Sequence, residues 1–136
     1  MAGRLGAEAR GELARGGSGE SAETFNEDWI GKDPSTDTDV AIEFLYHDCD
    51  EETIRWALTT RRLFLPEAVY DERIPLDDAA PSTYIVAAQD GTIRPEWQRR
   101  MARERLHVEP VEMATGHCPH VSQPERLADM LIRACP

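Results

Sequence analysis

Apolar residues in the last third of the chain follow the pattern of two buried strands separated by a helix. Residues 83–88 are β-branched, aromatic or small and almost continuously apolar, which is typical of a strand buried on both faces in a parallel sheet. Residues 108–113 form a second apolar-rich stretch, and Pro110 within it favours a position at the rim of the sheet. The pattern therefore predicts two parallel strands.

Helical spacing of apolar residues predicts the elements that connect and follow these strands. Pro95 suits the first position of a helix, on which Trp97 and Met101 lie four residues apart. Pro124 begins a last helix, and we expect its buried face to consist of Leu127, Met130, Leu131 and Ala134. The predicted order from residue 81 onward is strand, helix, strand, helix, although two strands alone do not make a stable sheet.

Two short amphipathic helices are predicted upstream, within residues 25–80. We expect Ser35 or Thr36 to cap the first helix and Asp48 or Asp50 to cap the second. Their apolar stripes comprise Val40, Ala41, Phe44 and Leu45 in the first helix and Ile54, Ala57 and Leu58 in the second. Helices this short depend on packing against other elements, so we expect them to form a lid or cap.

These elements divide the chain into three parts. Residues 1–24 are rich in glycine and contain few large apolar side chains, so we expect a disordered tail. Residues 25–80 form the helical lid or cap segment. Residues 81–136 form an α/β core portion, a βαβα unit of a parallel sheet.

Composition and charge narrow the classes of partner. The chain has 136 residues and a net charge of −11, and residues 25–90 contain 16 acidic and 5 basic side chains. The sequence has no basic stripe to neutralise phosphates, which argues against nucleic acid as a partner. No run reaches the roughly 18 apolar residues of a membrane span, and the N-terminal stretch lacks the apolar core of a signal peptide.

Cys49, Cys118 and Cys135 form no C-x-x-C pair, which indicates reduced thiols, so we expect a cytoplasmic protein.

An acid and a histidine follow the two predicted strands. Asp90 comes directly after the first strand, and His117 comes after the second in a Gly-His turn. Because the carboxyl ends of parallel strands meet at one edge of a sheet, we expect the two side chains to lie together there. The alternative is that Asp90 is a plain turn residue, since Asp-Gly is a strong turn signal. His120 lacks a preceding glycine, and we expect it to be a loop residue.

The same residues resemble the C-terminal part of the α/β-hydrolase family, in particular its small esterase and hydroxynitrile-lyase-like branch. The resemblance covers roughly residues 38–136 and rests on the strand that ends in Gln-Asp, on Ile-Arg-Pro-Glu-Trp-Gln, and on Gly-His-Cys-Pro-His followed by Pro-Glu-Arg-Leu-Ala. It implies that Asp90 is the catalytic acid and His117 the catalytic histidine of a Ser-His-Asp mechanism acting on carboxylic esters. It also implies that residues 46–50 and the helix after them belong to a lid.

The sequence lacks the motif that carries the nucleophile in that family. The family's serine lies in a Gly-x-Ser-x-Gly elbow between a strand and a helix, and the run from Gly16 to Glu20 fails this motif at its last position. The family's oxyanion-hole loop and first strands should lie upstream as well. We therefore expect a truncated and inactive fragment of an ester hydrolase. The alternative is a non-enzymatic α/β remnant or interaction module, which would self-associate through an exposed sheet edge.

Two other chemistries would use the same residues. His117, Cys118 and His120 are close in sequence, and residues 47–50 form a second group of possible metal ligands, but neither group has a known zinc spacing. Cys118 is a possible nucleophile beside His117, although adjacent residues in a turn usually point apart. We expect no metal and no cofactor, and a small-molecule ester as the substrate of the completed protein.

Overall fold

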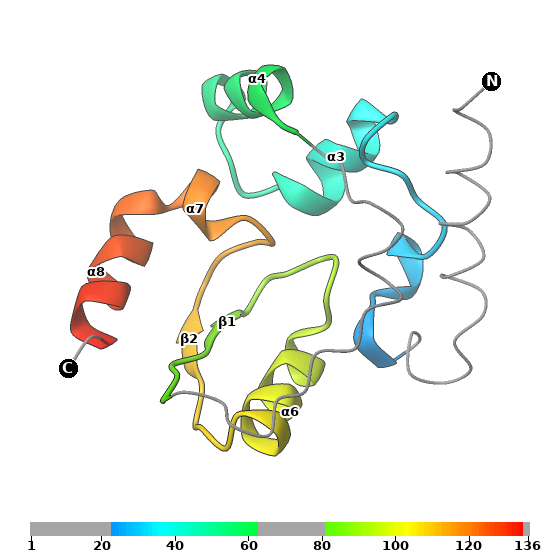
Figure 1. Cartoon of the computed structure of the whole chain (residues 1–136). Helices are drawn as coiled ribbons and strands as arrows, with labels where there is room; N and C mark the ends of the chain where they lie inside the picture. The colour runs from blue at the N-terminus through cyan, green and yellow to red at the C-terminus, as the bar shows by residue number, and fades with distance from the viewer. Residues whose placement is uncertain (1–22, 63–80, 135–136) are drawn as a thin grey trace.

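The described part of the chain, residues 23–62 and 81–134 of a computed structural model, is a partial α/β fold (Figure 1). Its elements in chain order are η1 (Glu27–Trp29), α3 (Thr38–Leu45), α4 (Glu51–Thr60), β1 (Ile85–Ala87), α6 (Pro95–Arg105), β2 (Val111–Met113), α7 (Pro119–Ser122) and α8 (Pro124–Ala134). The order confirms the predicted α/β class and the strand–helix–strand–helix unit, to which the structure adds the short helix α7.

β1 and β2 form a parallel pair in which Ile85 lies opposite Val111 and Ala87 lies opposite Met113. Both strands are shorter than predicted, but backbone hydrogen bonds continue the ladder beyond them. The Ala88 amide donates to the Met113 carbonyl at 2.9 Å, and the next bond, 3.0 Å long, joins the two loops that follow the strands. These two loops therefore leave the sheet side by side.

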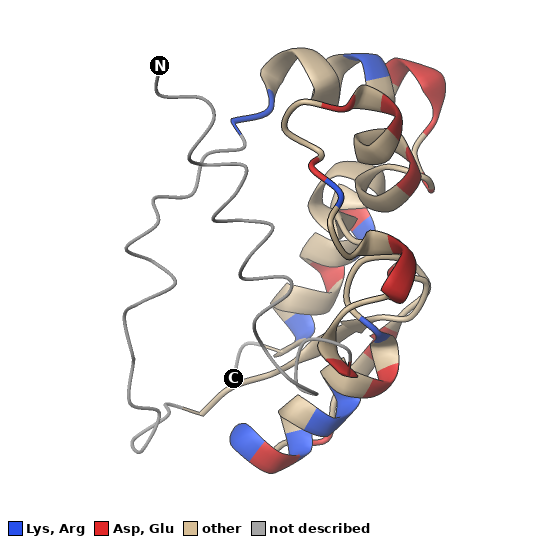
Figure 2. Ribbon diagram, turned by 90° about the vertical axis from the view of Figure 1, so that its right-hand side faces the viewer, with Lys and Arg blue, Asp and Glu red and all other residues tan. Residues whose placement is uncertain are grey.

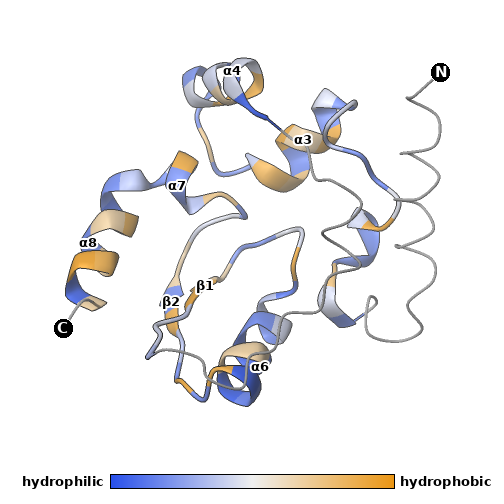
Figure 3. Cartoon of the chain, in the orientation of Figure 1, coloured by the Kyte–Doolittle hydropathy of each residue, from blue (hydrophilic) through white to orange (hydrophobic). Residues whose placement is uncertain are grey.

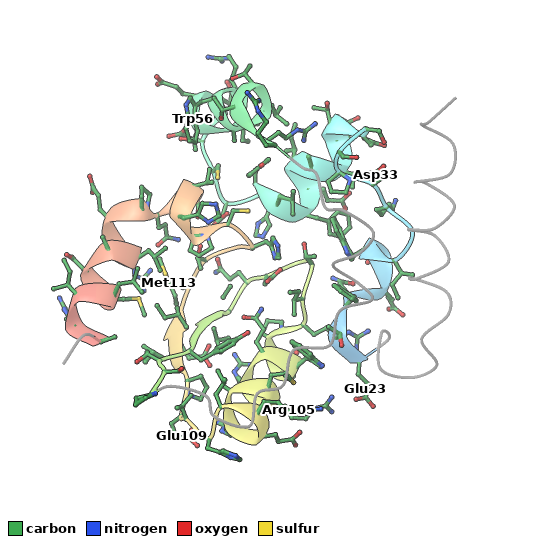
Figure 4. All side chains as sticks on the ribbon, in the orientation of Figure 1. Glu23, Asp33, Trp56, Arg105, Glu109 and Met113 are labelled. Carbon is green, nitrogen blue, oxygen red and sulfur yellow. The ribbon has the colours of Figure 1, made fainter. Side chains whose placement is uncertain are left out.

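The buried part of the sheet lies at its carboxyl end. Val86 and Met113 are fully buried and Ala87 is nearly so, whereas Val111 at the start of β2 is 46% exposed. The crossover helix α6 packs against β1, and Figure 4 labels Met113 on β2. The predicted burial is confirmed for the first strand, and the exposed start of β2 agrees with the rim position favoured by Pro110.

Aspartates cap both upstream helices. The Asp37 side chain accepts the amides of Asp39 and Val40 at the start of α3, and the Asp50 side chain accepts the Thr53 amide at the start of α4. The prediction of Ser35 or Thr36 as the cap of α3 is wrong, because Ser35 turns back to bond with the carboxylate of Asp33. Asp50, one of the two predicted candidates, caps α4.

The two upstream helices differ in how many of their residues are buried. All four predicted residues of α3 are buried, whereas α4 buries Ala57 alone and leaves Trp56, labelled in Figure 4, 58% exposed. Ala41, Leu45, Tyr46 and Ala57 form a core cluster, against which Cys118 and Val121 pack. The assignment of these helices to a lid remains a prediction.

The predicted buried face of α8 is wrong. The helix starts at Pro124 as predicted, but none of its described residues is buried, and Leu131 and Ile132 are 50% and 71% exposed. Figure 3 shows apolar colouring along α8, which has α7 as its main neighbour among the described elements. The apolar pattern is present, but the described residues cover it only in part: Leu127 and Met130 are half-buried. Among the described residues, no helix is long and apolar enough to cross a membrane.

Arginines of α6 tie this helix to its surroundings through exposed ion pairs. Arg99 forms a two-pronged pair with Glu112 of β2, at 2.7 and 3.0 Å, and Arg100 contacts Glu23 at 2.7 Å. Figure 2 shows basic residues mainly at the α6 end and acidic residues mainly towards α3 and α4. The charged side of α6 therefore faces solvent. Residues 1–22 of the predicted tail lie outside the described residues.

Candidate active site

The structure brings Asp90 and His117 together at the carboxyl edge of the sheet. The Nδ1 atom of His117 lies 3.0 Å from Oδ2 and 3.1 Å from Oδ1 of Asp90. The ladder bond from the Gln89 amide to the Thr115 carbonyl joins the residues just before this pair, so the parallel register dictates the juxtaposition. The Asp90 side chain is 4% exposed and that of His117 is 28% exposed. A buried acid thus faces a histidine that is open to solvent on part of its surface.

The Asp90 carboxylate also shapes its own turn. Its Oδ1 accepts the Thr92 amide at 2.8 Å and the Ile93 amide at 3.1 Å, and its Oδ2 accepts the Gln98 amide group at 3.0 Å. Together with His117 these donors match the roughly four acceptor sites of an ionised carboxylate. The Asp90 carboxylate therefore both stabilises its own turn and contacts His117.

Gln98 is a site residue that the sequence reasoning missed. It is 4% exposed, its Nε2 also donates to the Ile93 carbonyl at 3.1 Å, and its Oε1 accepts the Ala87 amide at 3.1 Å. Its burial agrees with its place on the helix, because Gln98 lies four residues before the fully buried Ala102, on the same face of α6. A glutamine on an apolar helix face requires a buried polar partner, and Asp90 is that partner.

The turn between α3 and α4 reaches both loops of the pair. The Oδ2 atom of Asp48 accepts the Gly116 amide at 2.7 Å and the Thr115 hydroxyl at 3.0 Å. The Nε2 atom of His47 donates to the Gln89 carbonyl at 3.0 Å. Sequence reasoning treated Asp48 as a possible helix cap or metal ligand and His47 as part of a ligand group. In the structure, both residues instead bind backbone groups of the two loops that follow the strands.

Electrostatics agree with an ionised Asp48. Burial raises the pKa of this carboxyl, but the hydrogen-bond donors of Gly116, Ser122 and Thr115, together with the charge of His47, outweigh that effect and leave the pKa below its ordinary value. A carboxylate that accepts a backbone amide and a hydroxyl favours its charged form.

Gly116 is required by close packing. A Cβ at this position would lie 2.7 Å from Asp48 Oδ1 and 2.7 Å from His47 Nε2. Real side chains do not approach that closely, so only glycine lets the turn contact the loop that carries His117. The Gly-His dipeptide, which sequence reasoning used as a motif, therefore has a steric explanation.

The two rival chemistries depend on the acidity of the Cys118 thiol and on the grouping of possible metal ligands. Burial, followed by the charges of Cys49, Asp90 and Asp48, raises the pKa of the Cys118 thiol to about 11. A thiol with that pKa is almost wholly protonated near neutral pH and is a poor nucleophile. Across residues 23–62 and 81–134, no three His, Cys, Asp or Glu side chains are grouped to hold a metal ion. His120 lies exposed on α7.

The arrangement suits His117 to act as a base. When Nδ1 donates to Asp90, the second ring nitrogen, Nε2, is the unprotonated acceptor. An imidazole held in one tautomer by a buried carboxylate is the acid–base part of a nucleophile-activating site. Ser122 of α7 is nearby, but its hydroxyl bonds with Thr115 and lies 3.4 Å from the Cys118 carbonyl. It is part of the turn's internal packing.

Comparison with protein families gives one match, to the alpha/beta hydrolase family over residues 2–130. The match begins well before residue 38, where the resemblance drawn from individual motifs starts. No curated protein and no solved structure matched the chain. The family match spans most of the sequence and includes both the Asp90 and His117 loops. The chain belongs to the alpha/beta hydrolase family.

Proposed function

We propose that Asp90 and His117 are the acid and the base of a Ser-His-Asp site that hydrolyses carboxylic esters, and that the serine comes from a part of the enzyme that this sequence lacks. The observation that carries the proposal is the 3.0 Å contact between His117 Nδ1 and the buried Asp90 carboxylate. Family membership supports the general class of hydrolase.

In this mechanism His117 performs two consecutive proton transfers, and Asp90 orients it. His117 Nε2 takes the proton of the serine hydroxyl while the serine oxygen bonds to the ester carbonyl carbon. The protonated imidazole then gives that proton to the departing alcohol, and a water molecule repeats the cycle to release the acid. Asp90 holds Nδ1–H and stabilises the imidazolium, and Gln98 holds Asp90.

The chain by itself is proposed to be inactive. The sequence contains no Gly-x-Ser-x-Gly motif, and general acid–base help alone contributes only about 10²–10⁴-fold. A fluorophosphonate probe should therefore leave the isolated chain unlabelled. Covalent labelling that disappears when one serine of this chain is replaced would overturn the fragment proposal.

The test of the dyad uses the coding sequence directly upstream. We expect a Gly-x-Ser-x-Gly elbow in one of its reading frames, and we expect the joined protein to hydrolyse p-nitrophenyl acetate. His117→Ala should lower kcat by about 10⁴-fold or more in that protein. His120→Ala is the matched control, because this exposed histidine of α7 is close in sequence and should leave kcat unchanged. An active joined protein that tolerates His117→Ala would refute the assignment.

A second candidate is an interaction module that self-associates. Exposed apolar residues favour it: Val111 is 46%, Leu131 50% and Ile132 71% exposed. The expected occupant of this surface and of the open sheet edge is a second copy of the chain. Sedimentation should then show a concentration-dependent dimer that Ile132→Glu abolishes, whereas a monomer at all concentrations would exclude this candidate.

For the compartment we propose the reducing cytoplasm. Cys49 and Cys118 are both free thiols, as is usual for proteins kept reduced. Intact-mass measurement on the protein purified from the cytoplasm without a reductant should show unmodified thiols.

A further inference from the structure

The turn between α3 and α4, residues Tyr46–Asp50, bridges two loops that are far from it in sequence. Asp48 bonds to Gly116 and Thr115, which lie 68 and 67 positions further along the chain. His47 bonds to the carbonyl of Gln89, 42 positions further along. One turn therefore holds the residue before Asp90 and the residue before His117.

The two loops differ in how they are held otherwise. Asp90 is fixed by two amides of its own turn and by Gln98. The backbone before His117 lies beyond the last ladder bond, and the Gly116 amide is held by the Asp48 carboxylate at 2.7 Å. Gly116 and His117 are adjacent, so a shift of that amide also moves the Cα atom that carries the imidazole.

Helix capping does not account for Asp48. The N-terminus of α4 is capped by Asp50, whose side chain accepts the Thr53 amide at 2.8 Å. The Asp48 carboxylate is turned across the chain instead, and the missing side chain of Gly116 creates the space for it. The two carboxylates of this turn therefore have different partners. Asp50 caps α4, and Asp48 binds the Gly116 amide, which is distant in sequence.

We infer that Asp48 is a positioning residue for His117, and that the turn Tyr46–Asp50 clamps the two loops that carry the acid–histidine pair. The inference rests on the proposed function of Asp90 and His117. Asp48 touches no reacting atom in this scheme; it acts through the Gly116 amide, which sets where the imidazole stands relative to Asp90.

The experiment measures the ring nitrogens of His117 in the full chain. Long-range ¹H–¹⁵N NMR of the histidine-labelled protein reports the tautomer, and hydrogen exchange reports the Gly116 amide. In the wild type we expect His117 protonated at Nδ1 in a single tautomer. Asp48→Ala should accelerate Gly116 exchange by about 10- to 100-fold, as expected for loss of a hydrogen bond to a charged group, and should give an averaged tautomer.

Three variants separate positioning from general destabilisation. Asp48→Asn keeps an oxygen acceptor and should retain the wild-type tautomer. Asp50→Ala removes the cap two residues away and should leave the His117 signals unchanged. Thr115→Val removes one of the donors to Asp48, keeps the side-chain volume, and should shift the tautomer in the same direction by a smaller amount even if Asp48→Ala fails to fold.

The outcomes distinguish the clamp from the dyad. A wild-type His117 with no fixed tautomer overturns both the proposed function and the inference. A fixed wild-type tautomer that persists in Asp48→Ala, or in Thr115→Val where the alanine variant does not fold, overturns the clamp alone. An effect of Asp50→Ala as large as that of Asp48→Ala, or an asparagine variant that behaves like the alanine variant, also overturns it.

Discussion

Replacing Gln98 with leucine tests whether buried polar contacts hold the Asp90 turn. The side chain makes three hydrogen bonds, to Asp90 Oδ2 at 3.0 Å and to the Ile93 carbonyl and Ala87 amide at 3.1 Å each. Gln98→Leu removes all three and leaves their partners in place. Each buried group left without a partner costs about 1–3 kcal/mol.

The net loss is smaller than the sum of these costs. Leucine has nearly the volume of glutamine and recovers apolar contact on the face of α6 shared with Ala102, and Asp90 keeps its two backbone donors. We therefore expect the free energy of unfolding to fall by about 2–4 kcal/mol. At about 3–5 °C per kcal/mol, Tm should fall by roughly 6–20 °C.

Urea unfolding followed by tryptophan fluorescence provides the measurement. Gln89→Leu is the matched control, because it is the same substitution at an exposed position next to Asp90 and should change stability by no more than about 0.5 kcal/mol. The reasoning would be refuted if Gln98→Leu unfolded within about 1 kcal/mol of the wild type at an unchanged m-value.

Three further predictions concern acidity, thiol reactivity and packing. The pKa of Asp48 is lowered on folding from its ordinary value of 3.8, so its stabilisation is present above that value and is lost as pH falls through the lower folded pKa. The wild type should therefore exceed Asp48→Asn in urea midpoint at about pH 6, with the difference shrinking at about pH 3. Burial raises the pKa of Cys49 and Cys118 to about 11, so iodoacetamide at about pH 7.5 should alkylate them at least about 100-fold more slowly in the folded than in the unfolded protein, as site-resolved mass spectrometry would show. Gly116→Ala should lower the free energy of unfolding by about 1–3 kcal/mol, whereas Gly91→Ala, whose Cβ would meet Phe44 at 3.8 Å, should leave it nearly unchanged in the same urea assay.

The sequence predicted features that depend on neighbouring residues and on the geometry of parallel strands. The apolar run before Asp90 predicted a buried strand, and the register then placed Asp90 beside His117 without further information. Asp37 and Asp50 cap helices because an aspartate just before a first turn satisfies free amides wherever it occurs. One of these two caps was missed only because neighbouring hydroxyl residues are also good caps.

Features that depend on distant partners were not predictable from the pattern. A glutamine at position 98 of an arginine-rich helix suggests a surface residue, and its burial becomes intelligible only once Asp90 is known to lie beneath it. Asp48 has a partner 68 residues away, and no local rule distinguishes it from Asp50. In α8 the pattern correctly indicated an apolar face, but periodicity cannot say which element covers such a face.

The distribution of contacts implies that the acid–histidine pair is organised without the nucleophile. Asp90 receives donors from the turn after β1, from α6 and from His117, and the Asp48 carboxylate holds the loop that carries His117. Under the proposed function, a serine from elsewhere in the enzyme would add its hydroxyl to this preassembled pair. The contact between His117 and Asp90 is thus compatible with a sequence that contains no Gly-x-Ser-x-Gly motif.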